Sequence, residues 1–391
     1  MRRVLAAFVG VLLVVVAGVV VHRVFAPGEV LARPTAAYPP APAVAAPGVV
    51  GTLPSAPLIV DGRLRVVADK RQVSADGPVD SRYLNTPYWS LRRWPAQVLG
   101  VVAAGSTVVT RWSDGVLVAL DARSGQESWR AQGDGPVSPD HPAVRTGAAA
   151  VYAPEGLYVA DDLVVAVGAV ETRAFHLATG AERWRAGTVC RAGGTAGFTT
   201  SDGRIAAGGG CALLDARTGA ASGSLPEGDA VPVGCATPRS ACAGVLISRE
   251  GEVEGLLFGS PGSPATRPAP ALAGPDARLV DGAAVTVAGG DVVAVGAADG
   301  GPRWRHPVGS GATVLAVQPG LVHVLTAERD LVTLDAGTGA ERSRFRYTYF
   351  AEGTDWVPGY AYAADGFVAT ERLRGPADDY FDAQPVILAA T

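Results

Sequence analysis

Charged residues are scarce in this chain. Asp, Glu, Lys and Arg make up 18% of its 391 residues, and Lys70 is its single lysine. Helical bundles and coiled coils need many Glu, Lys and Leu residues, so this composition argues against both. The formal net charge is −4, which provides no basic field to attract nucleic acid. We therefore expect no nucleic-acid partner.

One long apolar run stands near the N-terminus. It extends from Val4 to Val21, eighteen residues after Arg2 and Arg3, which is enough for a helix to cross a bilayer. A cleavable signal has a shorter apolar region followed by a small-residue site, and Pro27 disfavours cleavage after Ala26. We favour an uncleaved transmembrane signal anchor over 4–23, with a cleaved signal as the alternative. Residues 1–3 are then cytoplasmic, and everything after the span lies on the extracytoplasmic side of a bacterial cell membrane.

Residues 24–57 are rich in Ala and Pro. Proline removes backbone donors and favours an extended conformation. We therefore expect a semi-rigid stalk without secondary structure, followed by a folded domain over 58–391.

Cysteine is also scarce, and its four residues are Cys190, Cys211, Cys235 and Cys242. An even number in an exported chain predicts structural disulfides. We favour the local pairs Cys190–Cys211 and Cys235–Cys242, although the sequence leaves other pairings open. Zinc is the rival interpretation, but the segment contains no CxxC motif and no His.

Glycine, in contrast, is abundant, with 50 residues, and part of it belongs to a repeat of about forty residues. In the clearest copy, the apolar run 116–120 is followed by Asp121, Gly125 and Trp129. This order predicts a β-hairpin whose turn is shaped by Asp and a positive-φ Gly. Further copies are centred on Gly180, Gly219, Gly300 and Gly339.

Four short strands per repeat is the size of a propeller blade. We predict an all-β propeller of four-stranded blades, seven in number, with eight as the alternative because residues 58–98 can supply most of a blade. Strands at 63–68, 366–370 and 385–388 are expected to close the ring. A tryptophan that recurs at one position suits packing between blades, and we assign this role to Trp129, Trp184 and Trp304.

These copies resemble the pyrroloquinoline-quinone-like repeat family, whose blades carry a pattern close to Ala-x-Asp-x-x-Thr-Gly-x-x-x-Trp. Residues 119–129 and 174–184 match it with one change each, while 213–223 and 333–343 lack the Trp and 294–304 lacks the Asp. The resemblance covers about residues 98–346 and implies the propeller fold. The family includes quinone-dependent dehydrogenases, outer-membrane assembly scaffolds and exported propellers without a known ligand, so the resemblance leaves function open.

The residues of an enzyme site are mostly missing. The dehydrogenases of the resembled family use adjacent cysteines, a calcium held by carboxylate and amide groups, and an Asp. This chain has no adjacent cysteines, and Asn85 is its one asparagine. We expect neither quinone nor calcium as cofactor, and no catalytic, cofactor-binding or metal-binding residue is assigned. The acidic loop with Asp378, Asp379 and Asp382 is interpreted as solvated rather than as a cation site, and the isolated histidines as turn or surface residues: His141, His176, His306 and His323.

Aromatic residues gather in two places, near residue 90 and over 345–362. If the termini meet, they form either a binding surface for a sugar, peptide or protein, or the packing of the closure seam, which we favour. The residues of the possible surface are Trp89, Arg92, Arg93, Trp94, Tyr347, Tyr349 and Trp356.

Together these features favour a membrane-anchored, extracytoplasmic binding or scaffolding propeller with a protein or envelope-polymer partner. The alternatives are a quinone-dependent oxidoreductase with a diverged site and a glycan-binding sensor.

Overall fold

The structure is a computed structural model, and its description covers most of the chain after residue 27. The described residues are 28–42, 46–81, 86–133, 135, 146–168, 170–187, 197–207, 210–259, 266–274, 276–349, 355–373 and 385–391. Within these ranges no helix is both long and apolar enough to cross a membrane. The predicted span 4–23 lies outside them and stays a prediction.

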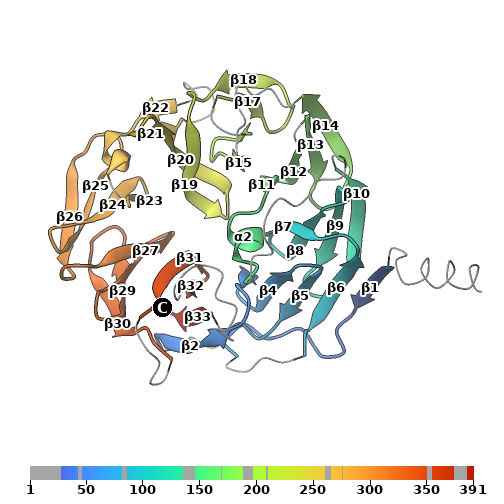
Figure 1. The fold of residues 1–391 in the computed structure, drawn as a ribbon, viewed down its shortest axis with the longest axis horizontal. Coiled ribbons are helices and arrows are strands. Elements are labelled where there is room, and N and C mark those ends of the chain that lie inside the picture. The colour runs from blue at the N-terminus through green and yellow to red at the C-terminus, as the bar shows by residue number, and fades with distance from the viewer. Residues whose placement is uncertain are drawn as a thin grey trace, which may run out of the picture.

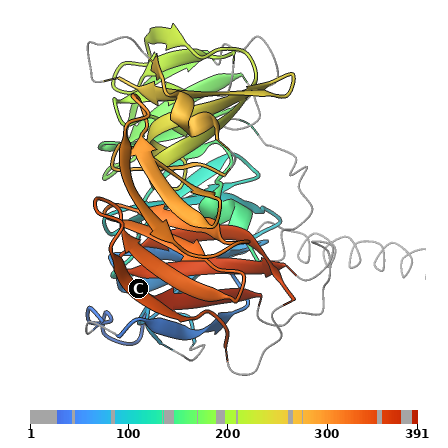
Figure 2. The ribbon, with the colours of Figure 1, turned by 90° about the vertical axis from the view of Figure 1, so that its left-hand side faces the viewer.

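Eight antiparallel sheets surround a common axis (Figure 1), and edge-on they form a flat disc (Figure 2). Blade 1 contains β3 (Leu58–Val60), β4 (Leu64–Asp69), β5 (Gln72–Asp76) and β6 (Trp89–Trp94). Blade 2 contains β7 (Val98–Ala104), β8 (Thr107–Trp112), β9 (Val116–Asp121) and β10 (Glu127–Gln132). Blade 3 contains β11 (Leu157–Ala160), β12 (Leu163–Val167), β13 (Glu171–His176) and β14 (Glu182–Gly187). Blade 4 contains β15 (Phe198–Thr199), β16 (Arg204–Ala206), β17 (Ala212–Asp215) and β18 (Ala221–Ser224).

The second half of the ring repeats this arrangement. Blade 5 contains β19 (Asp229–Thr237), β20 (Ser240–Arg249), β21 (Glu252–Phe258) and β22 (Thr266–Pro268), followed by the short 3-10 helix η1 (Pro270–Ala273). Blade 6 contains β23 (Arg278–Val280), β24 (Ala283–Ala288), β25 (Asp291–Gly296) and β26 (Pro302–Pro307). Blade 7 contains β27 (Thr313–Gln318), β28 (Leu321–Leu325), β29 (Asp330–Asp335) and β30 (Glu341–Arg346). Blade 8 contains β31 (Val357–Ala364), β32 (Phe367–Leu373), β33 (Val386–Ala390) and β2 (Gly48–Leu53).

The predicted all-β propeller with four-stranded blades is confirmed, but the count of seven is wrong. Residues 58–94 form a complete blade by themselves, so the expected closing strand 63–68 belongs to blade 1. The strand that closes the ring is β2, whose residues Gly48 and Leu53 pair with Ala390 and Val386 of β33. This pairing joins the N-terminal part of the domain to its last strand.

The expectation of a stalk without secondary structure is also wrong for two segments of 24–57. One is β2. The other is β1 (Gly28–Ala32), which pairs with β6 as a fifth, outermost strand of blade 1. Proline does not prevent either pairing, because both strands are free of it and each occupies the outer edge of its sheet.

Burial follows the position of each strand in its blade. Middle strands such as β9 and β29 have four consecutive buried residues, because both faces of a blade pack against its neighbours. The outermost strands β14, β26 and β30 alternate between exposed and partly buried residues. This alternation is the pattern of a sheet edge with one face toward solvent.

An insertion between blades 2 and 3 places the short helix α2 (Ala148–Tyr152) near the ring centre, against β4, β7 and β31 (Figure 1). The hydroxyl of Tyr152 donates to the carbonyl of Pro57 at 2.8 Å, and its ring stacks on Tyr362 at 5.1 Å between centroids. The hydroxyl of Thr146 donates to the buried carboxylate of Glu371 at 2.5 Å. These contacts fix the insertion to blades 1 and 8.

Blade 5 contains the longest hairpin, β19–β20. Cys235 lies opposite Cys242, and the two form the predicted disulfide. The backbone N–H of Thr199 in blade 4 donates to the carbonyl of Arg239 at 3.0 Å, and the N–H of Val159 in blade 3 donates to the hydroxyl of Ser240 at 3.0 Å. The hairpin thus ties three blades together. Cys211 is disulfide-bonded as well, and its expected partner Cys190 lies outside the described residues.

Candidate functional site

The possible aromatic surface does not form as one patch. Trp89, Arg92, Arg93 and Trp94 all lie on β6, whereas Tyr347, Tyr349 and Trp356 lie between β30 and β31, at the junction of blades 7 and 8. Trp89, Tyr347 and Trp356 have no exposed area. A surface containing these three was therefore a wrong prediction, because each ring is enclosed between blades.

The junction of blades 7 and 8 is packed by Tyr347 and Trp356, whose rings meet edge-on at 6.4 Å. The guanidinium of Arg329 lies 4.5 Å from the Trp356 ring centroid, a cation–π contact. The hydroxyl of Tyr347 donates to Thr370 at 3.0 Å. These residues pack blade 7 against blade 8. The favoured alternative also placed the aromatic residues near residue 90 in the closure seam, but Trp89 lies between blades 1 and 2.

The repeated tryptophans share one geometry, which we call the tryptophan dock. Each indole lies against the positive-φ glycine in the turn of the next blade, and its Nε1–H donates to the carbonyl of the residue three positions before that glycine. A methyl group on any of these glycines would lie 2.6 Å from the tryptophan. The docks are Trp129 on Gly180 (Nε1 to Leu177, 2.7 Å), Trp184 on Gly219 (to Ala216, 2.8 Å) and Trp304 on Gly339 (to Ala336, 2.8 Å).

Trp89 forms a fourth tryptophan dock that the sequence reasoning missed. It lies against Gly125 in blade 2, and its Nε1–H donates to the carbonyl of Ala122 at 2.9 Å. The sequence did contain a signal for this dock. The Gly125 turn needs a partner from the preceding blade, and Trp89 begins the fourth strand of that blade.

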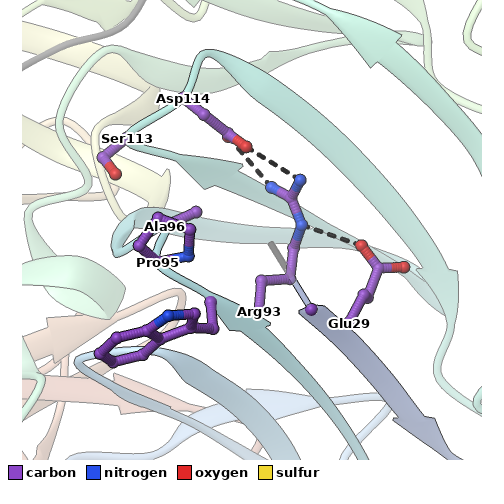
Figure 3. Close-up of a pocket in the computed structure, with 8 residues that line it drawn as sticks. Glu29, Arg93, Pro95, Ala96, Ser113 and Asp114 are labelled. Carbon is purple, nitrogen blue, oxygen red and sulfur yellow. Dashed lines mark hydrogen bonds and ion pairs between the residues drawn. The ribbon is translucent and has the colours of Figure 1, made fainter. Parts of the chain in front are cut away.

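Two of the other residues of β6, Arg93 and Trp94, border a cavity of about 450 Å3 at the edge of blades 1 and 2, whereas Arg92 does not line it (Figure 3). Trp94, Pro95 and Ala96 connect β6 to β7, Ser113 and Asp114 form the turn between β8 and β9, and β1 supplies Glu29. The cavity therefore exists because β1 pairs with β6. Its lining is Gly28, Glu29, Arg93, Trp94, Pro95, Ala96, Ser113 and Asp114.

Arg93 is the electrostatic centre of this cavity. Its Nη1 and Nη2 donate to both carboxylate oxygens of Asp114 at 3.0 and 2.9 Å, and its Nε donates to Glu29 at 2.9 Å (Figure 3). Arg130 approaches Glu29 from the other side at 2.5 and 2.9 Å. Hydrogen bonds from Arg130 lower the pKa of the Glu29 carboxyl, against the opposing effect of its partial burial. Glu29 is therefore held ionised, and β1 is fixed by charge as well as by strand pairing.

Trp94 provides the apolar wall of the cavity. The guanidinium of Arg71 lies 4.0 Å from its ring centroid, which holds the ring in place. The hydroxyl of Ser113 accepts a hydrogen bond from the backbone N–H of Gln97 at 2.9 Å. Asp114 retains the largest exposure of the charged lining groups, at 41% of its side chain. The cavity offers a fixed carboxylate beside an aromatic edge, which suits binding.

Two further expectations concern titratable residues. His323 was expected on the surface or in a turn, but it is fully buried, so that expectation is wrong. Its ring nitrogens lie 2.9 Å from Gln318 Nε2 and 3.1 Å from Thr333 Oγ1, and burial lowers its pKa to about 4. The residue is a neutral polar group of the blade 7 core. The acidic loop with Asp378, Asp379 and Asp382 lies outside the described residues, as does His141.

Comparison with known proteins places the fold among related propellers. The family described as outer membrane protein assembly factor BamB matches residues 55–219 and 264–357. No curated protein is significantly similar to the chain.

Several solved structures are similar to the chain over most of its length. BamB from Moraxella catarrhalis is 15% identical, with a TM-score of 0.44 over 89% of this chain and 98% of that one. The C-terminal WD40 domain of Sif2 is 11% identical, with a TM-score of 0.48 over 90% and 99%. Quinohemoprotein alcohol dehydrogenase from Comamonas testosteroni is 13% identical, with a TM-score of 0.45 over 89% and 76%.

Proposed function

The chain belongs to the PQQ-like repeat β-propeller family, and the family model that matches it is described as an outer membrane protein assembly factor. We propose that the chain is a non-catalytic scaffold for another protein or an envelope polymer. The construction of the β1–β6 cavity carries this proposal. Its charged lining groups, Glu29, Arg93 and Asp114, are joined in one fixed network. A general acid or base must exchange its proton readily. Carboxylates held in ion pairs with Arg93 are instead suited to holding a ligand in a defined orientation.

The residues that the structure describes do not fit the quinone and calcium of the family's dehydrogenases. The Cys235–Cys242 disulfide joins residues seven positions apart rather than neighbours. No group of three or more His, Cys, Asp or Glu in the described part of the chain is arranged to hold a metal ion.

The proposal extends to the location of the propeller. Residues 4–23 would anchor it in the cell membrane, with the ring on the extracytoplasmic side, where the Cys235–Cys242 disulfide suits an oxidising compartment. β1 begins at Gly28, so the anchor would hold blade 1 close to the bilayer. The full chain should sediment with membranes after an alkaline wash, and deletion of residues 2–23 should abolish this. Recovery of the full chain in the soluble fraction would contradict the anchor.

Site-specific photo-cross-linking tests the scaffold. Val30 on β1 is 63% exposed and lies next to Glu29, so a photoreactive phenylalanine there should give one discrete adduct in cells. The matched control position is Val253 on β21, 43% exposed, where no such adduct is expected. The charge reversal Asp114→Arg should remove the Val30 adduct. Identical adducts at both positions would show that the cavity edge has no partner of its own.

Cofactor retention tests the non-catalytic part of the proposal. Purified protein is incubated with pyrroloquinoline quinone and Ca2+, passed through a desalting column and assayed for quinone absorbance and for dye reduction with alcohols. We expect neither signal. A retained quinone band with dye reduction would replace the scaffold with an oxidoreductase.

A further inference from the structure

The turn of blade 6 has the same backbone as the four turns that receive a tryptophan. The N–H of Gly300 donates to Gly296 at 2.8 Å, and that of Gly296 donates to Gly301 at 2.7 Å. In the Gly339 turn the corresponding bonds, from Gly339 to Asp335 and from Asp335 to Ala340, measure 2.8 and 2.9 Å. The φ angles of Gly300 and Gly339 are +67° and +72°. The receiving half of a tryptophan dock is therefore built in blade 6.

This turn differs from the other four in being open. Within the described ranges, and apart from the neighbours of Gly300 in the chain, no atom lies within 4 Å of the position that a Cβ would take on Gly300, whereas a tryptophan lies at 2.6 Å in each of the others. Gly300 is exposed, whereas Gly125 and Gly339 are buried. The carbonyl of Ala297, three positions before Gly300, is the equivalent acceptor, and no donor to it is found within the described ranges.

The preceding blade explains the open turn. The fourth strand of blade 5, β22, consists of Thr266, Arg267 and Pro268 and contains no aromatic residue. All seven tryptophans of the chain lie in the described ranges. Four form docks, and the other three are enclosed elsewhere, Trp112 and Trp356 by burial and Trp94 beside the β1–β6 cavity. No tryptophan of this chain is left to fill the turn.

We propose that the Gly300 turn is a receptor for a tryptophan side chain supplied by a partner protein. The four filled docks of this molecule define the ligand, which is an indole lying on the glycine with its N–H directed at the Ala297 carbonyl. Asp299 is exposed beside Gly300, so its negative charge favours a ligand with a basic residue next to the tryptophan. The chain's own docking segments have this form, since Arg183 and Arg185 flank Trp184.

This inference deepens the proposed function, because it names a side chain that the scaffold recognises, at a place distinct from the β1–β6 cavity. The two sites are separable. The cavity belongs to blades 1 and 2, and the open turn lies where blade 5 adjoins blade 6.

The test uses the peptide Glu-Arg-Trp-Arg-Ala, capped at both ends, with 5-fluorotryptophan as the reporter in fluorine NMR. Full-length protein in detergent should broaden the fluorine signal saturably, with a dissociation constant of about 1 mM, as expected of a single anchoring side chain. The Ala-for-Trp peptide should fail to compete. Absence of saturable broadening would overturn the receptor, while the cross-linking and quinone tests would still decide the scaffold.

Two glycine substitutions locate the binding. Gly300→Ala places a methyl group where the indole must lie, so binding should weaken at least tenfold. Gly289→Ala is the matched control, because Gly289 lies in the same blade, has a φ of +61° and also has an open Cβ position. Both variants carry similar backbone strain, and Gly289→Ala should bind the peptide like the parent. Equal binding by Gly300→Ala and the parent, or an equal loss in both variants, would overturn the proposal.

Discussion

Two kinds of junction hold the ring together. The junctions that follow blades 1, 2, 3 and 6 each contain a tryptophan dock, made by one residue and one turn of the repeat. The hairpin with the Cys235–Cys242 disulfide joins blade 5 to blades 3 and 4, and Tyr347 and Trp356 pack the junction of blades 7 and 8. A dock needs only two positions of a repeated motif. Where the motif is lost, the chain uses longer-range contacts that are specific to one place.

The largest expected effect tests a dock directly. Trp89 is fully buried and hydrogen-bonded, so Trp89→Ala should lower the free energy of unfolding by about 4 kcal/mol, the range for a large buried aromatic. Trp89→Phe keeps most of the packing and should cost about 1 kcal/mol for the lost hydrogen bond. Denaturant midpoints measure both. Equal losses would show that the hydrogen bond, rather than the ring, holds the junction.

The pH dependence of stability tests the core of the docked blade 7. Burial lowers the pKa of His323 to about 4, so between about pH 6.5 and 4 the unfolded chain binds a proton that the folded chain does not. Stability due to this group is present above about pH 6.5 and is lost as the pH falls, by about 3 kcal/mol at pH 4. Urea titrations should show this slope in the parent and not in His323→Gln. Parallel pH profiles would contradict the neutral buried state.

Loss of the disulfide should have a smaller effect. The variant with Cys235→Ser and Cys242→Ser opens a short loop, which costs about 2 kcal/mol. Hydrogen exchange should accelerate at Thr199 and Ser201, which bond to Arg239 and Cys242 of the hairpin, and stay unchanged at the docked Gly339 turn. Faster exchange at both places would mean that the two kinds of junction unfold as one unit.

The smallest expected effect is the difference in stability between substitutions in a filled and in an open turn. Gly339→Ala adds a methyl group 2.6 Å from Trp304, and overpacking together with positive-φ strain should cost about 2 to 3 kcal/mol. Gly300→Ala meets open space and should cost only the strain, about 1 kcal/mol. Thermal unfolding of the two variants gives the difference. Equal shifts would mean that Trp304 moves aside without loss.

The sequence predicts the parts of this fold that repeat. The spacing of Asp, Gly and Trp around residues 121–129 predicts the hairpin, its turn and the packing role of the Trp. The number of blades was harder to obtain, because blade 1 lacks the motif turn and its Trp89 looks like one of several clustered aromatics. β1 and β2 were missed because pairings between residue 30 and residue 92, or between 48 and 390, leave no local pattern.

The candidate site could not be predicted from the sequence either, because it also depends on a long-range strand pairing. Arg93 and Trp94 were named as part of a possible surface, but the cavity also requires Glu29 from β1 and Asp114 from the turn between β8 and β9. Nothing in the local sequence of Glu29 distinguishes it from any charged residue of a proline-rich segment. Its role depends on β1 joining the edge of blade 1.

The ring can close only after its last strand has been synthesised. β33 lies between β2 and β32 and is synthesised after every other strand of the ring. During translation, β2 must therefore wait without its partner until more than three hundred further residues have emerged. Any chaperone or nearby chain with a free strand can compete for β2 throughout that interval. A stop codon before Pro385 would make the delay permanent.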